Sequence, residues 1–233
     1  MILPGTDYGK IFDVMTSEKE KVSYTIKKMV DEQRRTAKKT HRVVMHSVKR
    51  YINPSSRNTY IIWTNVRNGI CAAESVLLLN DETGKPEIYH ITKSLEVSRS
   101  LPAPQTVEWL NVYTPHFLAR YRERTGKPTS MPLDELVARM IPEMTEMRTV
   151  PYYEDVCRRE DDGSQFAHQV PEGVIFGTSR QCSTPTGRCF TVHRNNTFIS
   201  QDMLTKSQTQ HLLGKQTLEM VKNYSAILKK LNS

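Results

Sequence analysis

The chain has 233 residues, of which 37% are hydrophobic, and it carries a formal net charge of +8 with an isoelectric point near 9.3. This length suits one large domain or two small ones, and the apolar fraction can fill a core. No apolar run reaches the roughly 18 residues of a membrane span, and the first residues lack the pattern of a secretory signal. The composition therefore excludes a membrane partner and predicts a cytoplasmic protein.

The first predicted element is a long basic helix. Residues 1–16 show no periodicity, whereas Ser17 and Glu20 fit a capping box and apolar residues recur at helical spacing as far as Lys39. Between Lys27 and Arg50 nine lysines and arginines face only two acidic residues. Such a block is typical of a contact with a polyanion, and we expect RNA rather than DNA. The residues expected to bind it are Arg34, Arg35, Lys38, Lys39 and Arg42.

The next segments favour an antiparallel sheet. Residues 41–51 fit either a strand or a second helical piece. Runs rich in β-branched and aromatic residues then cover 58–66, 72–80 and 87–95, separated by RNG and NDETGKP, which are turn sequences of a meander. The run TVEWLNVY at 106–113 predicts one more strand, which leads directly into a helix.

That helix has the clearest boundaries in the chain. In TPHFLARYRERTG, residues 114–126, Thr114 can cap the N-terminus, Pro115 fits the first helical position, and Gly126 fits just past the end. At 3.6 residues per turn, His116, Arg120 and Arg124 follow one another along one face.

The remaining segments complete the predicted fold. We expect a helix over 133–147, a loop over 151–172, strands over 173–181 and 187–200 with a tight turn at Asn195-Asn196, and a final helix over about 209–231. The sequence thus predicts an α+β fold, with a mainly antiparallel sheet, flanking helices and a basic N-terminal helical arm. The expected division is an arm and helix over 1–50 and an α+β domain over 51–233.

Most common catalytic and cofactor motifs are absent. The chain contains no GxxxxGK[ST], HExxH, GxSxG or GxGxxG, and no cofactor is expected. The four cysteines form no CxxC pair. A zinc site built from Cys182, Cys189 and His193, with Cys157 or His168 as fourth ligand, stays open as an alternative to four reduced thiols.

The helix over 114–126 suggests phosphate chemistry. Imidazole exchanges a proton near neutral pH, and guanidinium matches the geometry of phosphate oxygens. Cleavage of RNA without a metal needs a base for the 2′-hydroxyl and cations for the charge of the transition state. His116, Arg120 and Arg124 could supply both. The alternative is an exposed helix face in which Glu123 pairs with an arginine.

The order of residues over about 112–204 resembles the barnase–EndoU–colicin–RelE superfamily of toxin-type ribonucleases. Its recurrent helix, H-A-x-x-R-x-x-E-R-G, is similar to this chain in the histidine, the first arginine, the Glu-Arg pair and the glycine. The resemblance implies RNA cleavage without a metal, giving 2′,3′-cyclic phosphate ends. It implies a site of His116 and Arg120, completed by His193, Arg194 or Thr197 from the last strand.

Two other functions fit the same sequence. The first is a non-catalytic nucleic-acid-binding protein, in which the basic block and the helix arginines hold phosphates and Trp63, Trp109 or Tyr121 stacks on bases. The second is a structural or assembly protein of a mobile element or virus, which would form oligomers.

Overall fold

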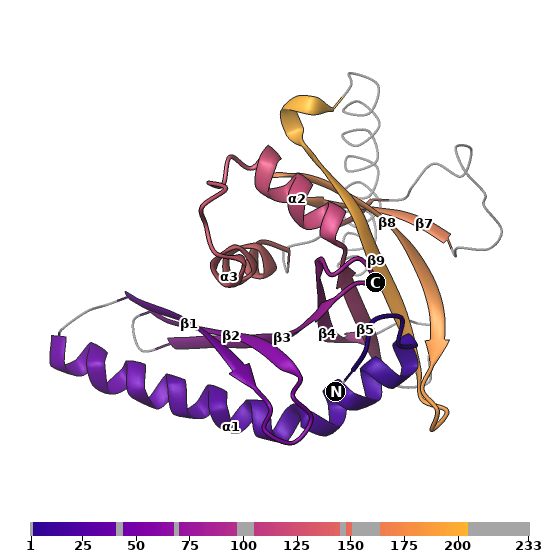
Figure 1. The fold of residues 1–233 in the computed structure, drawn as a ribbon. Coiled ribbons are helices and arrows are strands. Elements are labelled where there is room, and N and C mark those ends of the chain that lie inside the picture. Colours follow the sequence, from indigo (N-terminus) through magenta and orange to yellow (C-terminus); the bar gives the residue numbers. More distant parts are fainter. Residues whose placement is uncertain are drawn as a thin grey trace, which may run out of the picture.

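The structure is a computed structural model that describes residues 2–40, 44–67, 70–96, 105–144, 148–150 and 164–204. A nine-stranded sheet with strand order β1-β2-β3-β4-β5-β9-β8-β7-β6 forms its centre, and helices cover both faces (Figure 1). The strands are β1 Val44–Ile52, β2 Thr59–Arg67, β3 Ile70–Asn80, β4 Pro86–Glu96, β5 Gln105–Tyr113, β6 Arg148–Val150, β7 Ser164–Val170, β8 Gly173–Ser183 and β9 Cys189–Ser200. The helices are α1 Tyr8–Thr40, α2 Pro115–Arg124, α3 Leu133–Met144 and the short 3-10 turn η1 Gln201–Met203.

The sheet is almost entirely antiparallel, which confirms the predicted α+β class. Strands β1 to β5 form a meander, α2 and α3 then cross over the sheet, and β9 pairs with β5 in parallel. The remaining pairs are antiparallel. A parallel pair needs a long crossover connection, and here the chain between β5 and β9 contains α2, α3 and strands β6 to β8.

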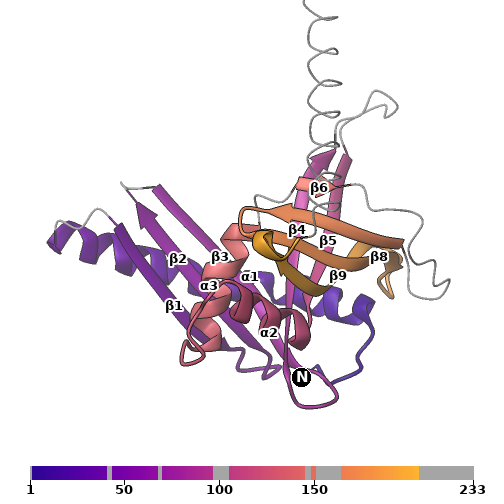
Figure 2. The same ribbon diagram turned by 90° about the horizontal axis from the view of Figure 1, so that it is seen from above.

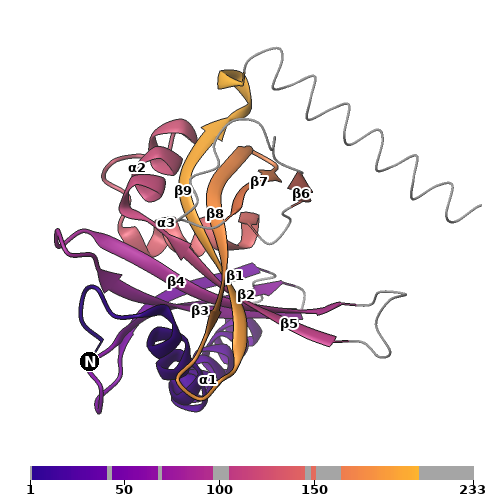
Figure 3. The ribbon, with the colours of Figure 1, turned by 90° about the vertical axis from the view of Figure 1, so that its right-hand side faces the viewer.

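The core has two layers, one on each face of the sheet. On one face α1 buries an apolar stripe that includes Ile11, Phe12 and Val22. On the other face α2 and α3 bury a cluster around Phe117 and Ile141. Figures 2 and 3 show α2 and α3 on the side of the sheet opposite α1.

Helix α1 begins nine residues before the predicted start. Its first turn is capped by Asp7, whose side-chain oxygen accepts a hydrogen bond from the Gly9 backbone N–H at 2.7 Å. Ser17 lies inside the helix, where its hydroxyl donates to the Val14 carbonyl at 2.9 Å, so the predicted capping box is wrong. The helix packs along the sheet rather than extending from it as an arm, and the predicted boundary at residue 50 falls inside β1.

Four other predicted segments can be compared with the elements of the structure. The conflicting segment over 41–51 forms strand β1 from Val44 onward. The predicted loop over 151–172 contains strand β7, while residues 151–163 lie outside the described residues. Helix α3 continues through Pro142 to Met144, in agreement with the prediction over 133–147. The predicted C-terminal helix over 209–231 also lies outside the described residues.

The predicted turn at Asn195-Asn196 is wrong, because β9 runs through both residues. Gly177 pairs with Asn195 and Phe176 with Thr197, so Asn196 is the extra residue of a β-bulge. The Asn195 side chain is buried and donates to the Val112 carbonyl of β5 at 3.3 Å. Contacts with a strand eighty residues earlier thus override the local turn preference.

None of the helices in the described ranges combines the length and the apolar character that crossing a bilayer requires.

Candidate functional site

Helix α2 has the boundaries that the sequence predicts. The Thr114 hydroxyl accepts a hydrogen bond from the Phe117 N–H at 3.2 Å, Pro115 starts the helix, and Gly126 follows its end with a φ of 63°. Phe117 and Tyr121 face the core. His116 is exposed near the N-terminus of the helix.

The arginines of α2 are engaged in contacts within the fold. Arg120 forms an ion pair with Glu123 at 2.8 Å, which is the local pairing that the sequence left open. Arg122 donates to the carbonyls of Thr129 at 2.8 Å and Met131 at 3.1 Å. These bonds attach the following loop to the helix.

The second predicted arginine of this face, Arg124, donates to the Phe198 carbonyl of β9. Its guanidinium therefore joins the helix to the last strand. Of the three predicted side chains on this face, only His116 has no hydrogen-bond or ion-pair partner among the described residues.

His193 lies in a largely aromatic cluster on β9 and neighbouring strands. Its ring centroid is 6.4 Å from that of Trp109, 5.0 Å from Phe166 and 5.4 Å from His168, and none of these residues belongs to α2. Burial lowers the pKa of His193 to about 4. The ring is therefore neutral at pH 7 and brings no positive charge to a phosphate.

Arg194 and His193 point to opposite faces of the sheet, as successive residues of a strand do. Arg194 donates to the Tyr8 hydroxyl at the start of α1 at 2.8 Å. His193 instead contacts Phe166, which belongs to the core under α2 and α3. These two predicted site residues are therefore not brought together. Thr197 follows the bulge, opposite Phe176 of β8, and is half-buried.

The zinc alternative finds no support in the described part of the chain. There, no group of three or more His, Cys, Asp or Glu side chains lies close enough to hold a metal ion. Cys182, Cys189 and His193 consequently do not form such a group, and Cys157 lies outside the described ranges.

The predicted basic residues lie on the C-terminal half of α1. Arg34, Arg35, Lys38 and Lys39 are all exposed, and Arg42 lies outside the described residues. The face of the helix opposite the sheet thus presents cations to solvent.

A groove of about 560 Å³ lies between the middle of α1 and strand β1. Its basic and aromatic lining consists of Lys21, Tyr24 and Lys28 from the helix and Lys49 and Tyr51 from the strand. Glu20 and Thr25 complete the lining, so three cations face one carboxylate. We call this surface the lysine–tyrosine groove.

Tyr24, the tyrosine that α1 contributes to the groove, is unusually exposed. Tyr24 is 74% exposed, although an aromatic side chain of this size is normally buried in large part. Trp63 and Tyr121, two of the predicted stacking residues, are only 2% and 0% exposed and cannot stack on a base. The third, Trp109, is half-buried beside His193.

The sequence alone could predict the helix side of this groove but not its strand side. Helical spacing from Lys21 to Tyr24 and Lys28 puts all three on one polar face, which the sequence alone could indicate. The contribution of Lys49 and Tyr51 depends on the strand that lies beside the helix. Their segment had conflicting helix and strand signals.

Comparison with known proteins identifies no relative, since no protein-family model, curated protein or solved structure matches this chain.

Proposed function

We propose that this protein binds single-stranded nucleic acid, RNA in the first place, along the lysine–tyrosine groove. The observation that carries the proposal is the composition of the groove: three lysines and two tyrosines around a space of about 560 Å³, with a single carboxylate. A positively charged groove with aromatic rings is the general solution for binding a single strand without reading its sequence.

The lysines of the groove are available for phosphates. Among the described residues no carboxylate lies within ion-pair distance of Lys28 or Lys49. Lys21 makes one exposed hydrogen bond, to the Ser55 hydroxyl at 3.3 Å. A phosphate can therefore bind these ammonium groups without breaking an ion pair, and counterions released from the strand favour binding.

The exposed ring of Tyr24 supplies the aromatic contact. Stacking of a base on such a ring contributes about 1–3 kcal/mol. Every base has a π-face, so this contact favours single strands over paired ones whose bases are already stacked.

The basic surface continues along α1 beyond the groove. Arg35 lies seven residues after Lys28, as Lys28 does after Lys21, and Lys39 follows one turn later. This spacing keeps all four on one side of the helix. From Lys21 to Lys39 the rise is about 27 Å, which accommodates several nucleotides of an extended strand.

The proposal predicts a strong effect of groove variants on binding. The double variant Lys28→Ala/Lys49→Ala should weaken binding to a uridine-rich single strand about tenfold or more, and it should lower the log–log salt slope by about 0.7 per lysine. Tyr24→Ala should weaken binding by about 1–3 kcal/mol with an unchanged salt slope. Fluorescence anisotropy of labelled RNA over a salt series measures both quantities.

A matched control removes the same charge elsewhere. Lys10→Ala/Lys85→Ala takes two exposed lysines from outside the groove, so it should change affinity about twofold at most at moderate salt. Equal losses in the two double variants would mean that net charge alone attracts RNA and would refute the groove. Metal-independent ribonuclease activity through His116 stays a prediction from the sequence.

A further inference from the structure

A second cleft lies at the N-terminal end of α1, between its first turn and strands β8 and β9. It has a volume of about 240 Å³ and is lined by Tyr8, Thr178, Arg180, Val192 and Arg194. Thr178 pairs with Arg194 and Arg180 with Val192, so the four strand residues are cross-strand neighbours. The cleft therefore presents two guanidinium groups and two hydroxyls, and no carboxylate is among its described lining residues.

One of the two arginines is held in a fixed position. Arg194 Nη1 donates to the Tyr8 hydroxyl at 2.8 Å and lies 3.4 Å from the Glu87 carboxylate. Glu87 is buried and also accepts a hydrogen bond from the Tyr89 hydroxyl. A guanidinium has five N–H donors, and those on Nε and Nη2 of Arg194 have no partner among the described residues.

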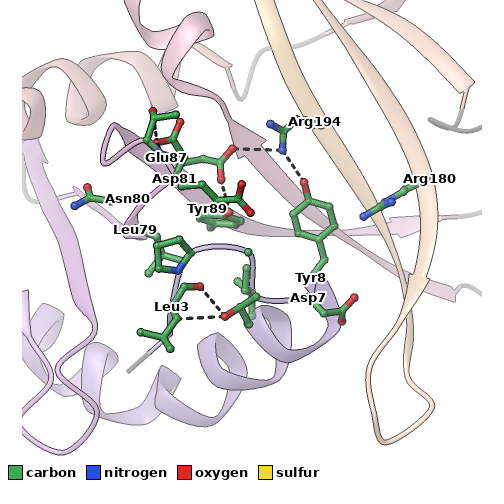
Figure 4. Close-up of a pocket in the computed structure, with 16 residues that line it drawn as sticks. Leu3, Asp7, Tyr8, Leu79, Asn80, Asp81, Glu87, Tyr89, Arg180 and Arg194 are labelled. Atoms are coloured by element: carbon green, nitrogen blue, oxygen red, sulfur yellow. Dashed lines mark hydrogen bonds and ion pairs between the residues drawn. The ribbon is translucent and has the colours of Figure 1, made fainter.

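The other arginine has no acidic partner in the described chain. The Arg180 guanidinium lies 4.8 Å from the centre of the Tyr8 ring, and no described carboxylate is within ion-pair distance of it. Figure 4 shows the ring of Tyr8 between Arg180 and Arg194. Two cations at one small cleft repel each other and favour an anion that binds both.

Gly9 allows the first turn of α1 to lie close to strand β8 beside this cleft. A Cβ at Gly9 would lie 2.4 Å from the Ser183 carbonyl oxygen at the end of β8. The missing side chain lets the first turn of α1 approach the β8–β9 hairpin closely, which brings Tyr8 into contact with both arginines.

A larger cavity of about 560 Å³ adjoins the cleft and shares Tyr8, Arg180 and Arg194 with it (Figure 4). The polar lining of this cavity includes four carboxylates, those of Asp7, Asp81, Glu82 and Glu87, the last of which is paired with Arg194. Carboxylates accept hydrogen bonds from hydroxyl and amino groups, so the cavity suits a donor-rich organic group. Its size is in the range of small-molecule sites.

We propose that this composite pocket binds a small phosphomonoester, with its phosphate between Arg180 and Arg194 and its donor-rich part, such as the sugar and base of a nucleotide, in the larger cavity. A guanidinium group can donate two parallel hydrogen bonds to two oxygens of one phosphate. The hydroxyls of Tyr8 and Thr178 can donate to the remaining oxygens. The site lies 16 residues along α1 from Tyr24, about 24 Å away, and is separate from the lysine–tyrosine groove.

Isothermal titration of the full chain with adenosine 5′-monophosphate, and separately with adenosine, tests this site without using RNA. We expect the monophosphate to bind at least about tenfold more tightly than adenosine. Arg180→Gln should weaken that binding about tenfold, because Arg180 is exposed and its loss leaves the fold intact. Lys10→Gln, an exposed lysine of the same helical turn outside the cleft, should leave it within about twofold.

Three results would overturn the proposal: no binding at millimolar monophosphate, equal binding of adenosine, or equal losses in Arg180→Gln and Lys10→Gln. A 5′-phosphorylated dinucleotide distinguishes the two sources of a phosphomonoester, since tighter binding of the dinucleotide assigns the end of a strand and tighter binding of the monophosphate assigns a free nucleotide. Either result supports the phosphate site. An Arg180→Gln protein that still binds RNA separates this site from the groove.

Discussion

At the scale of single residues, the histidines of the aromatic cluster show how burial changes chemistry. His168 is only 6% exposed, and neither ring nitrogen has a hydrogen-bond partner among the described residues. Burial, and the nearby His193, lower the pKa of His168 to about 4. Both rings are therefore neutral at pH 7, and the folded state resists their protonation.

Because the folded state lowers the pKa values of both histidines, we expect the free energy of unfolding to fall in mild acid. In the unfolded chain both histidines take up a proton near pH 6.5, whereas in the folded chain they do so near pH 4. Their contribution to stability is thus complete above pH 6.5 and is lost as the pH falls through the interval down to about 4. The loss per histidine is at most about 1.4 kcal/mol per pH unit.

Urea unfolding at pH 7 and pH 5 measures this loss, and His168→Leu should reduce it. Leucine breaks no hydrogen bond within the described residues, because the histidine nitrogens make none there. His116→Gln is the control, because it replaces an exposed histidine that lies outside the aromatic cluster. An equal pH dependence in wild type and His168→Leu would show that His168 is not the buried neutral group described above.

At the scale of elements, α2 is fixed to the sheet at both ends. Thr114 caps the helix and also donates to the Asn195 carbonyl of β9 at 3.1 Å, while Arg124 reaches the Phe198 carbonyl further along the same strand. The helix is therefore held against β9 at both ends. Arg120, Arg122 and Arg124 make contacts within the fold, whereas His116 has no hydrogen-bond or ion-pair partner among the described residues.

The cap gives an element-scale prediction. Thr114→Ala removes the hydrogen bonds of a buried hydroxyl to β9 and to the Phe117 N–H, so it should lower the free energy of unfolding by about 1–2 kcal/mol. Thr114→Ser keeps the hydroxyl and should retain most of the stability. Chemical denaturation of the three proteins makes the comparison, and equal stability of the alanine and serine variants would contradict the role of the hydroxyl.

The elements differ in how far the sequence predicts them. Thr114, Pro115 and Gly126 are local signals, so the boundaries of α2 can be read from them. The start of α1 cannot, because Glu18 interrupts its apolar stripe. The Glu18 carboxylate is buried, and it accepts hydrogen bonds from the Tyr60 hydroxyl at 2.7 Å and the Asn58 amide at 3.1 Å. Both donors come from a segment about forty residues later in the chain. The local sequence around Glu18 cannot predict such a contact.

At the scale of the whole molecule, the long helix α1 carries the two proposed binding surfaces at different points along its length. Its first turn lines the proposed phosphate pocket together with β8 and β9, and its middle forms the lysine–tyrosine groove with β1. The sequence predicted a basic helix, and Arg34, Arg35, Lys38 and Lys39 are exposed on it. The groove and the pocket depend on which strands lie beside the helix, which is set by the sheet order and not by local pattern.

The most direct test of the proposed function is to locate bound RNA on the whole protein. Ultraviolet cross-linking of a uridine-rich single strand, followed by mass spectrometry of the digested protein, reports which peptides contact the bases. We expect cross-links in the peptides that contain Tyr24 and Tyr51, and their loss in Tyr24→Ala. Cross-links confined to the peptide around His116 on α2, unchanged in Tyr24→Ala, would contradict the lysine–tyrosine groove.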